Sequence, residues 1–137
     1  MGKLLLDTCA TIWVAAGDPI SPTAKSAIER AEQQAGQIGI STFTAWEVGT
    51  LAAKGRIALS IPVETWFQRL SDLPQTCILE ASATILIRST ILPGAAPKDP
   101  ADRIIISTAR EHALTIVTRD QEILEYANQG HVSALEC

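Results

Sequence analysis

The sequence has few of the residues that build zinc sites, disulfide frameworks or side-chain nucleophiles. Its 137 residues include three cysteines and two histidines. The cysteines are odd in number and widely spaced, with no CxxC pair, which argues against a disulfide framework and a zinc site alike. The motifs GxSxG, GxxxxGK[ST], GxGxxG and HExxH are also missing. Serine hydrolase, P-loop, dinucleotide-binding and zinc protease sites are therefore not expected.

Long apolar runs and an excess of basic residues are missing as well. Apolar runs such as residues 4–6 and 104–106 are too short to span a bilayer, and no signal-peptide pattern is present. We therefore expect a cytoplasmic protein without membrane association. The formal net charge of -4 has the wrong sign for a protein that holds nucleic acid by a general basic surface. If the partner is RNA, another source of positive charge is required.

What is present is the composition of a folded α/β protein. Hydrophobic residues make up 47% of the chain, and its length suits one core, so we expect residues 1–137 to form a single domain. Short apolar segments alternate with helical patterns, which predicts a central parallel sheet of about five strands flanked by helices. The expected strands are residues 3–6, 37–40, 76–79, 114–117 and 131–135. The expected helices are residues 22–34, 41–54 and 121–128, one that starts after Pro62, one that runs through Ile91, and one that the segment Asp99-Pro100-Ala101-Asp102 opens and that runs to about residue 112.

Four acidic side chains stand at the boundaries between these elements. Taken singly, three of them have a structural interpretation. Glu47 fits a capping box with Thr44, Asp120 fits an N-cap, and Asp102 suits the positive end of a helix dipole behind an Asp99 N-cap. Asp7 ends a buried strand without an obvious helix to cap, and it needs another explanation.

Taken jointly, the four acids predict a site. Asp7 and Asp120 follow strands, whereas Glu47 and Asp102 lie in the opening turns of helices. In a parallel α/β sheet all four positions fall at the carboxyl edge, where such folds bind their ligands. Four carboxylates converging there repel one another unless they are protonated or neutralised by cations. Oxygen ligands select Mg²⁺ or Mn²⁺, which would also supply the missing positive charge for a phosphodiester substrate.

These residues carry a resemblance that spans nearly the whole chain. The chain resembles the PIN-domain ribonucleases, and within them the VapC-type toxins of toxin–antitoxin systems. The matching segments are LLLDT, STFTAWEVGTLAAKGRI, DPADRIIISTAREHAL and TIVTRD. The resemblance implies that Asp7, Glu47, Asp102 and Asp120 are the catalytic, metal-binding acids. Asp99 departs from the family pattern by giving the third motif a second acid, and we treat it as supporting.

The resemblance also implies a fold, an activity and partners. The implied fold is the PIN-like three-layer fold, and the implied activity is Mg²⁺- or Mn²⁺-dependent hydrolysis of RNA by a metal-activated water. A homodimer and neutralisation by a small cognate antitoxin follow from the same likeness. The alternative is a PIN-like domain that binds RNA or protein without cleaving. Retention of all four acids favours the nuclease.

Other residues have supporting roles in this interpretation. Thr8 and Thr118 are expected to hydrogen-bond the acids or a metal-bound water. Five cations are candidates for contacts with RNA phosphates, namely Lys54, Arg56, Lys98, Arg103 and Arg119. Three tryptophans, Trp13, Trp46 and Trp66, are able to stack bases, but their helical spacing among aliphatic neighbours favours packing in the core.

Two other acidic sites at the ends of parallel strands are disfavoured by spacing. A phospho-acceptor receiver domain requires adjacent acids after the first strand and an Asp after the third. In this chain Asp7 has no acidic neighbour, and residues 77–80 contain no Asp. A phosphatase with an aspartate nucleophile requires a DxD pair. This chain lacks the second acid, because the residue two positions after Asp7 is Cys9.

Overall fold

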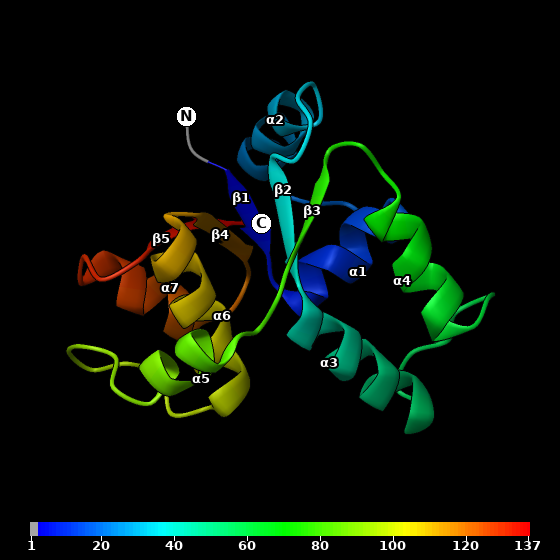
Figure 1. Ribbon diagram of the computed structural model, residues 1–137. Coiled ribbons are helices and arrows are strands. Elements are labelled where there is room, and N and C mark those ends of the chain that lie inside the picture. Colours follow the sequence, from blue (N-terminus) through cyan, green and yellow to red (C-terminus); the bar gives the residue numbers. More distant parts are fainter. Residues whose placement is uncertain (1–2) are drawn as a thin grey trace.

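Five strands and seven helices are formed by residues 3–137, the part of the chain that the computed structural model describes (Figure 1). The strands are β1 (Leu4–Leu6), β2 (Ile38–Ser41), β3 (Thr76–Leu79), β4 (Thr115–Thr118) and β5 (Ser133–Glu136). The helices are α1 (Thr8–Ala16), α2 (Pro22–Ala31), α3 (Thr42–Ala53), α4 (Val63–Ser71), α5 (Ala83–Ser89), α6 (Pro100–His112) and α7 (Gln121–Asn128).

All neighbouring strands are parallel, and their order in the sheet is β3-β2-β1-β4-β5. From β1 the chain therefore builds the sheet outward on one side through β2 and β3. It then crosses back to β4 on the other side of β1. This reversal of strand order lies between β1 and β4, whose register pairs Leu6 with Val117. The carboxyl ends of these two strands form the position at which such sheets bind ligands.

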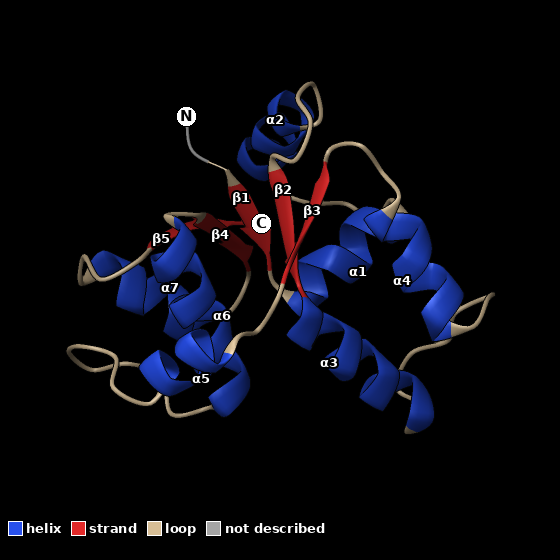
Figure 2. Ribbon diagram, in the orientation of Figure 1, coloured by secondary structure: helices blue, strands red, loops and turns tan. Residues whose placement is uncertain are grey.

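The residues of β1 alternate between two cores, one on each face of the sheet. Leu4 and Leu6 belong to one cluster, together with residues of α1 and α2. Leu5 belongs to the other, together with Ile105 and Ile106 of α6 and Tyr126 of α7. Figure 2 shows the strands between these two groups of helices. The predicted α/β fold with a central parallel sheet of five strands is confirmed.

The predicted elements agree with the structure apart from one helix and some ends. Strand β3 and helix α7 have the predicted bounds, and α2 ends at Ala31 rather than at residue 34. Helix α1 was not predicted, because its sequence TCATIWVAA is apolar on nearly all sides and shows no helical stripe. Within the described residues, no helix has the length and hydropathy that crossing a membrane requires.

Gly39 of β2 allows a test of how closely neighbouring atoms pack against the sheet. A Cβ added there would lie 2.9 Å from Leu79 Cδ1 and 3.1 Å from the Leu4 carbonyl oxygen. We expect Gly39→Ala to lower the free energy of unfolding by about 1–3 kcal/mol, the usual effect of overpacking. Gly49→Ala in α3 is the control, because nothing lies within 4 Å of the added Cβ. Urea denaturation of both variants should show loss for the first and a gain of about 1 kcal/mol for the second. Equal effects would contradict the packing described.

Candidate active site

A pocket at the carboxyl ends of β1 and β4 contains the acids that the sequence singles out. Asp7, Glu47, Asp102 and Asp120 all line it, and Asp99 lines it too. The four predicted acids come from four separate segments of the chain, and the fold brings them to one place. The expectation that they meet at one edge of the sheet is therefore confirmed as geometry, while their role in catalysis remains a proposal.

Asp7 has two hydrogen-bonding partners that fix its carboxylate. One oxygen accepts the backbone N–H of Ala10 at 2.8 Å, and the other accepts the hydroxyl of Thr118. Asp7 is thus the N-cap of α1. The expectation that Asp7 has no helix to cap was wrong, because α1 begins at the next residue. The Thr118 hydroxyl in turn accepts the backbone N–H of Asp120 at 2.9 Å, so a single buried side chain links the ends of β1 and β4.

Glu47 is held by α1 and not by its own helix. The Thr8 hydroxyl donates to Glu47 Oε1 at 2.5 Å and lies 3.2 Å from the Thr44 hydroxyl. The N-cap of α3 is Ser41, whose hydroxyl accepts the N–H of Phe43. The capping-box interpretation of Thr44 and Glu47 was therefore wrong, because α3 begins earlier than that motif requires. The predicted hydrogen bonds from Thr8 and Thr118 to the acids are both present.

Asp99 and Asp102 occupy the first turn of α6. Asp99 is the N-cap and accepts the N–H of Ala101 at 3.0 Å, as expected, with Pro100 as the first helical residue. Arg103 donates to the carbonyl oxygens of Ser89 and Pro97. These bonds tie the segment before α6 to the end of α5 and give Arg103 a structural role. The Arg103 guanidinium is engaged within the fold, which disfavours a role in binding RNA.

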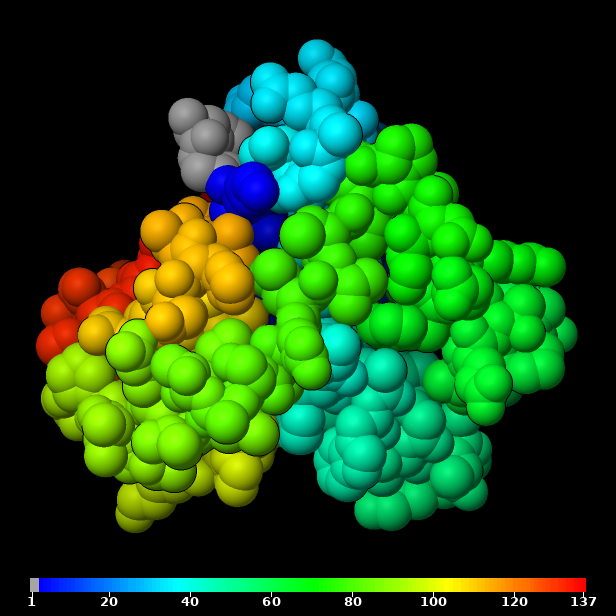
Figure 3. Space-filling model, viewed as in Figure 1, coloured from blue at the N-terminus to red at the C-terminus, as the bar shows by residue number. Residues whose placement is uncertain are grey.

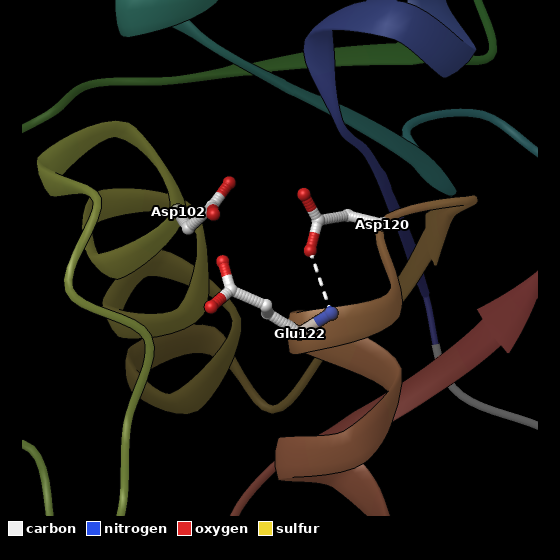
Figure 4. A group of neighbouring side chains, drawn as sticks. All are labelled: Asp102, Asp120 and Glu122. Atoms are coloured by element: carbon white, nitrogen blue, oxygen red, sulfur yellow. Dashed lines mark hydrogen bonds between the residues drawn. The ribbon is translucent and has the colours of Figure 1, made fainter.

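Asp120 caps α7 and lies beside an acid that sequence reasoning missed. One Asp120 oxygen accepts the N–H groups of Glu122 and Ile123 at 2.9 and 3.1 Å. Figure 4 shows the side chains of Asp102, Asp120 and Glu122 directed toward one another between α6 and α7. One carboxylate oxygen from each lies within 4.8 Å of those of the other two. Glu122 was missed because an acid in the first turn of a helix is usually explained by the helix dipole.

Burial and mutual repulsion make this pocket unfavourable for negative charge. Burial is the main cause that raises the pKa of Asp102 to about 7, and the charges of Asp120 and Asp99 contribute further. Burial also raises the pKa of Asp7, against the opposing hydrogen bonds from Thr118 and Ala10. Burial raises the pKa of Glu47 as well, although the hydrogen bond from Thr8 favours its ionised form. A cation bound among these groups would relieve the repulsion.

The cations predicted to meet RNA differ in their surroundings. Lys54, Arg56 and Lys98 are exposed. Arg119 lines the pocket, and its guanidinium lies 3.9 Å from the centre of the Trp13 ring. It also donates to the carbonyl oxygens of Pro19 and Cys137. Arg119 is thus a cation held in one orientation at the rim of an acidic pocket.

The three tryptophans differ in how far they are buried. Trp13 and Val14 pack against the core on the α1 side of the sheet, and Trp66 is half-buried. Trp46 is 63% exposed. For Trp46 the expectation of core packing was wrong, because the inward face of α3 is formed by Thr44 and Val48.

Comparison with known proteins points to one family. Residues 4–129 match the model of the PIN domain. The chain is 36% identical over 134 residues to Ribonuclease VapC22 of Mycobacterium tuberculosis, a match that covers 97% of this chain and 98% of the relative. A toxin-antitoxin complex from Klebsiella pneumoniae aligns with a TM-score of 0.59 and 28% identity, over 88% of this chain and 89% of that one. VapBC2 from Rickettsia felis, bound to a promoter DNA fragment, aligns with a TM-score of 0.65 over 98% of both chains; at 18% identity it supports the fold alone.

The raised pKa of Asp102 predicts how stability depends on pH in metal-free protein. The folded protein holds the proton of the Asp102 carboxyl more tightly than the unfolded chain, in which this carboxyl has the usual pKa of 3.8. Protonated Asp102 therefore contributes its full share to stability below pH 3.8, and this stabilisation is lost as the pH rises through about 7. In EDTA, we expect the free energy of unfolding to fall by about 1–2 kcal/mol between pH 5 and 8, allowing for partial exposure. Asp102→Asn should reduce that fall. An unchanged pH dependence in the variant would contradict the assignment.

Proposed function

Because this chain belongs to the PIN domain family, we propose that it is a divalent-metal-dependent endoribonuclease that acts as the toxin of a toxin–antitoxin pair. The observation that carries the proposal is the convergence of Asp7, Glu47, Asp102 and Asp120 in one pocket at the point where strand order reverses. The matching relative is named a ribonuclease, and that match extends over nearly the whole of both chains. The fold and the acids thus support the same activity.

The donor set in the pocket suits a hard divalent cation. Asp102, Asp120 and Glu122 offer only carboxylate oxygens, the ligands that Mg²⁺ and Mn²⁺ prefer. Ligand oxygens around one Mg²⁺ lie no more than about 4 Å apart, since each is about 2.1 Å from the ion. The three oxygens, within 4.8 Å of one another, need only small side-chain rotations to reach such an arrangement. We propose that Asp7 and Glu47 complete the site from its other side.

When bound, the ion supplies positive charge for the scissile phosphate and lowers the pKa of a water molecule. The residues of the chain position the components. Thr118 and the first turn of α1 hold the Asp7 carboxylate in one orientation, and Thr8 does the same for Glu47. We propose that Arg119, whose guanidinium lies against the Trp13 ring, contacts an RNA phosphate at the rim. Lys54, Arg56 and Lys98 are proposed as further phosphate contacts.

We further propose that a small cognate antitoxin neutralises the enzyme. The Klebsiella pneumoniae structure with 28% identity is described as a toxin-antitoxin complex. A basic side chain of the partner, most favourably an arginine, would replace the charge of the cation among the acids. We also propose that the protein works as a homodimer, as the sequence resemblance implies, and that it works in the cytoplasm.

A PIN-like domain that binds RNA or protein without cleaving it is the second candidate. The presence in the pocket of all four acids, and of Glu122 beside two of them, favours the nuclease. A domain that only binds RNA has no use for a cluster of carboxylates, because their negative charge repels phosphate.

The proposed reaction predicts a defined pair of product ends. Because water is the nucleophile and not the ribose 2′-hydroxyl, cleavage should require Mg²⁺ or Mn²⁺ and leave a 5′-phosphate and a 3′-hydroxyl. Purified protein incubated with total RNA, with and without Mn²⁺, followed by mapping of the cut ends, measures both properties. Cleavage that persists in excess EDTA, or ends that carry a 2′,3′-cyclic phosphate, would exclude this mechanism.

Substitutions in α6 and α7 separate the acids that bind the ion from the one that caps a helix. Asp102→Asn should reduce cleavage about 100-fold or more and abolish Mn²⁺ binding measured by calorimetry, because it removes a central ligand. Glu122→Gln should weaken Mn²⁺ binding about 10-fold. Asp99→Asn is the matched control, since the amide oxygen can still cap α6, and it should retain much of both activities. Equal losses from Asp99→Asn and Asp102→Asn would make Asp99 a direct ligand.

A further inference from the structure

A stacked pair of aromatic rings, the half-buried Phe43 and the exposed Trp46, lies on α3, the helix that also carries Glu47 of the acidic pocket. Trp46 is 63% exposed, and its ring stacks on Phe43 with the ring centres 5.4 Å apart and the planes 23° from parallel. The whole chain contains only six aromatic residues. Two of the six therefore stack on each other on one helix, and the large apolar ring of Trp46 faces solvent instead of the core. We call this Phe43–Trp46 pair the platform.

Helix geometry places this platform next to Glu47. With 3.6 residues per turn, residues three and four apart are neighbours on the helix surface. Phe43 is four residues before Glu47 and three before Trp46, so it lies between them. Thr44 and Val48 face the core, and Trp46 projects from the opposite side of α3. The surface thus runs from the carboxylate in the pocket, over Phe43, to the open face of Trp46.

Positive charge lies at the C-terminal end of the same helix. Lys54 is the C-cap of α3, seven residues after Glu47 and about 10 Å further along the axis, and helical spacing places it on the side that carries Phe43 and Glu47. Lys54 and Arg56 are both exposed. In a chain with a net charge of -4, this gathering of cations beyond the aromatic pair complements a nucleic-acid backbone. Figure 3 shows the outline of the molecule indented between α3 and the segment of α5 and α6.

We propose that Trp46, supported by Phe43, is a stacking platform for an unpaired RNA base that flanks the scissile phosphate, with Lys54 contacting the backbone beyond it. The inference rests on the proposed function and adds how the substrate is positioned. An aromatic face stacks on any base, so the platform selects single-stranded segments over duplexes. Phe43 orients the Trp46 ring and thereby acts as a positioning residue.

Binding of RNA without cleavage tests the platform directly. The probe is a fluorescently labelled 12-nucleotide single-stranded RNA of mixed sequence, measured by anisotropy in EDTA, with the same RNA in duplex form for comparison. We expect Trp46→Ala to weaken single-strand binding about 10-fold, the loss typical of one base stack. Trp46→Phe should restore most of it. Duplex binding should change little, because paired bases offer no free face.

The matched control is Ile87→Ala on α5. Ile87 is 64% exposed, nearly the same as Trp46, but it lies on α5 and has no aromatic ring on which a base can stack. Its removal should leave single-strand binding unchanged. RNA should also quench tryptophan emission in the wild-type protein and quench it less in Trp46→Phe. This spectroscopic signal does not depend on whether the alanine variant folds well.

The outcomes separate the platform from the proposed nuclease. Unchanged single-strand binding and quenching in the Trp46 variants would overturn the platform, even if the wild-type protein cleaves RNA. Weakened binding in a protein that never cleaves would retain the platform and exclude the nuclease. If Trp46→Ala binds RNA normally but changes its elution volume on gel filtration or loses a co-expressed partner, the surface is a protein interface and the proposal is wrong.

Discussion

The repulsion between carboxylates at one edge of the sheet is the constraint on which the site depends. Four predicted acids and Glu122 gather where β1 and β4 end, and burial with mutual repulsion raises the pKa of Asp102 to about 7. The fold tolerates this because the sheet and the two cores hold the backbone independently of the acids' charge. A divalent cation bound among the acids would offset this repulsion.

Three of the acids are also structural residues. Asp7, Asp99 and Asp120 are the N-caps of α1, α6 and α7. A carboxylate at an N-cap accepts backbone N–H groups, which fixes its orientation, and it lies near the positive end of the helix dipole. The strand-to-helix turn that ends β1 therefore also aims Asp7 into the pocket. Structural and functional explanations of these residues, which the sequence sets against each other, are compatible in the folded protein.

The sheet, its strand spacing and the four acids were predictable because each leaves a local signal: a short apolar run, a turn, or an acid at an element boundary. Three features were not. Helix α1 has no polar stripe, Glu122 resembles an ordinary acid of a first helical turn, and Trp46 was assigned to the core from its neighbours. Which side of α3 faces inward depends on how it packs against the sheet and α4, and that is a property of the whole fold.

The order of the strands also has a consequence during protein synthesis. Strand β4 is the neighbour of β1 in the sheet but follows it by more than a hundred positions in the chain. The ends of β1 and β4, joined through Thr118, cannot come together while the ribosome has yet to translate residues 115–120. A nascent or prematurely terminated chain that lacks this segment has no assembled acidic pocket. Any activity of the pocket therefore begins only after residues 115–120 have been translated and β4 has paired with β1.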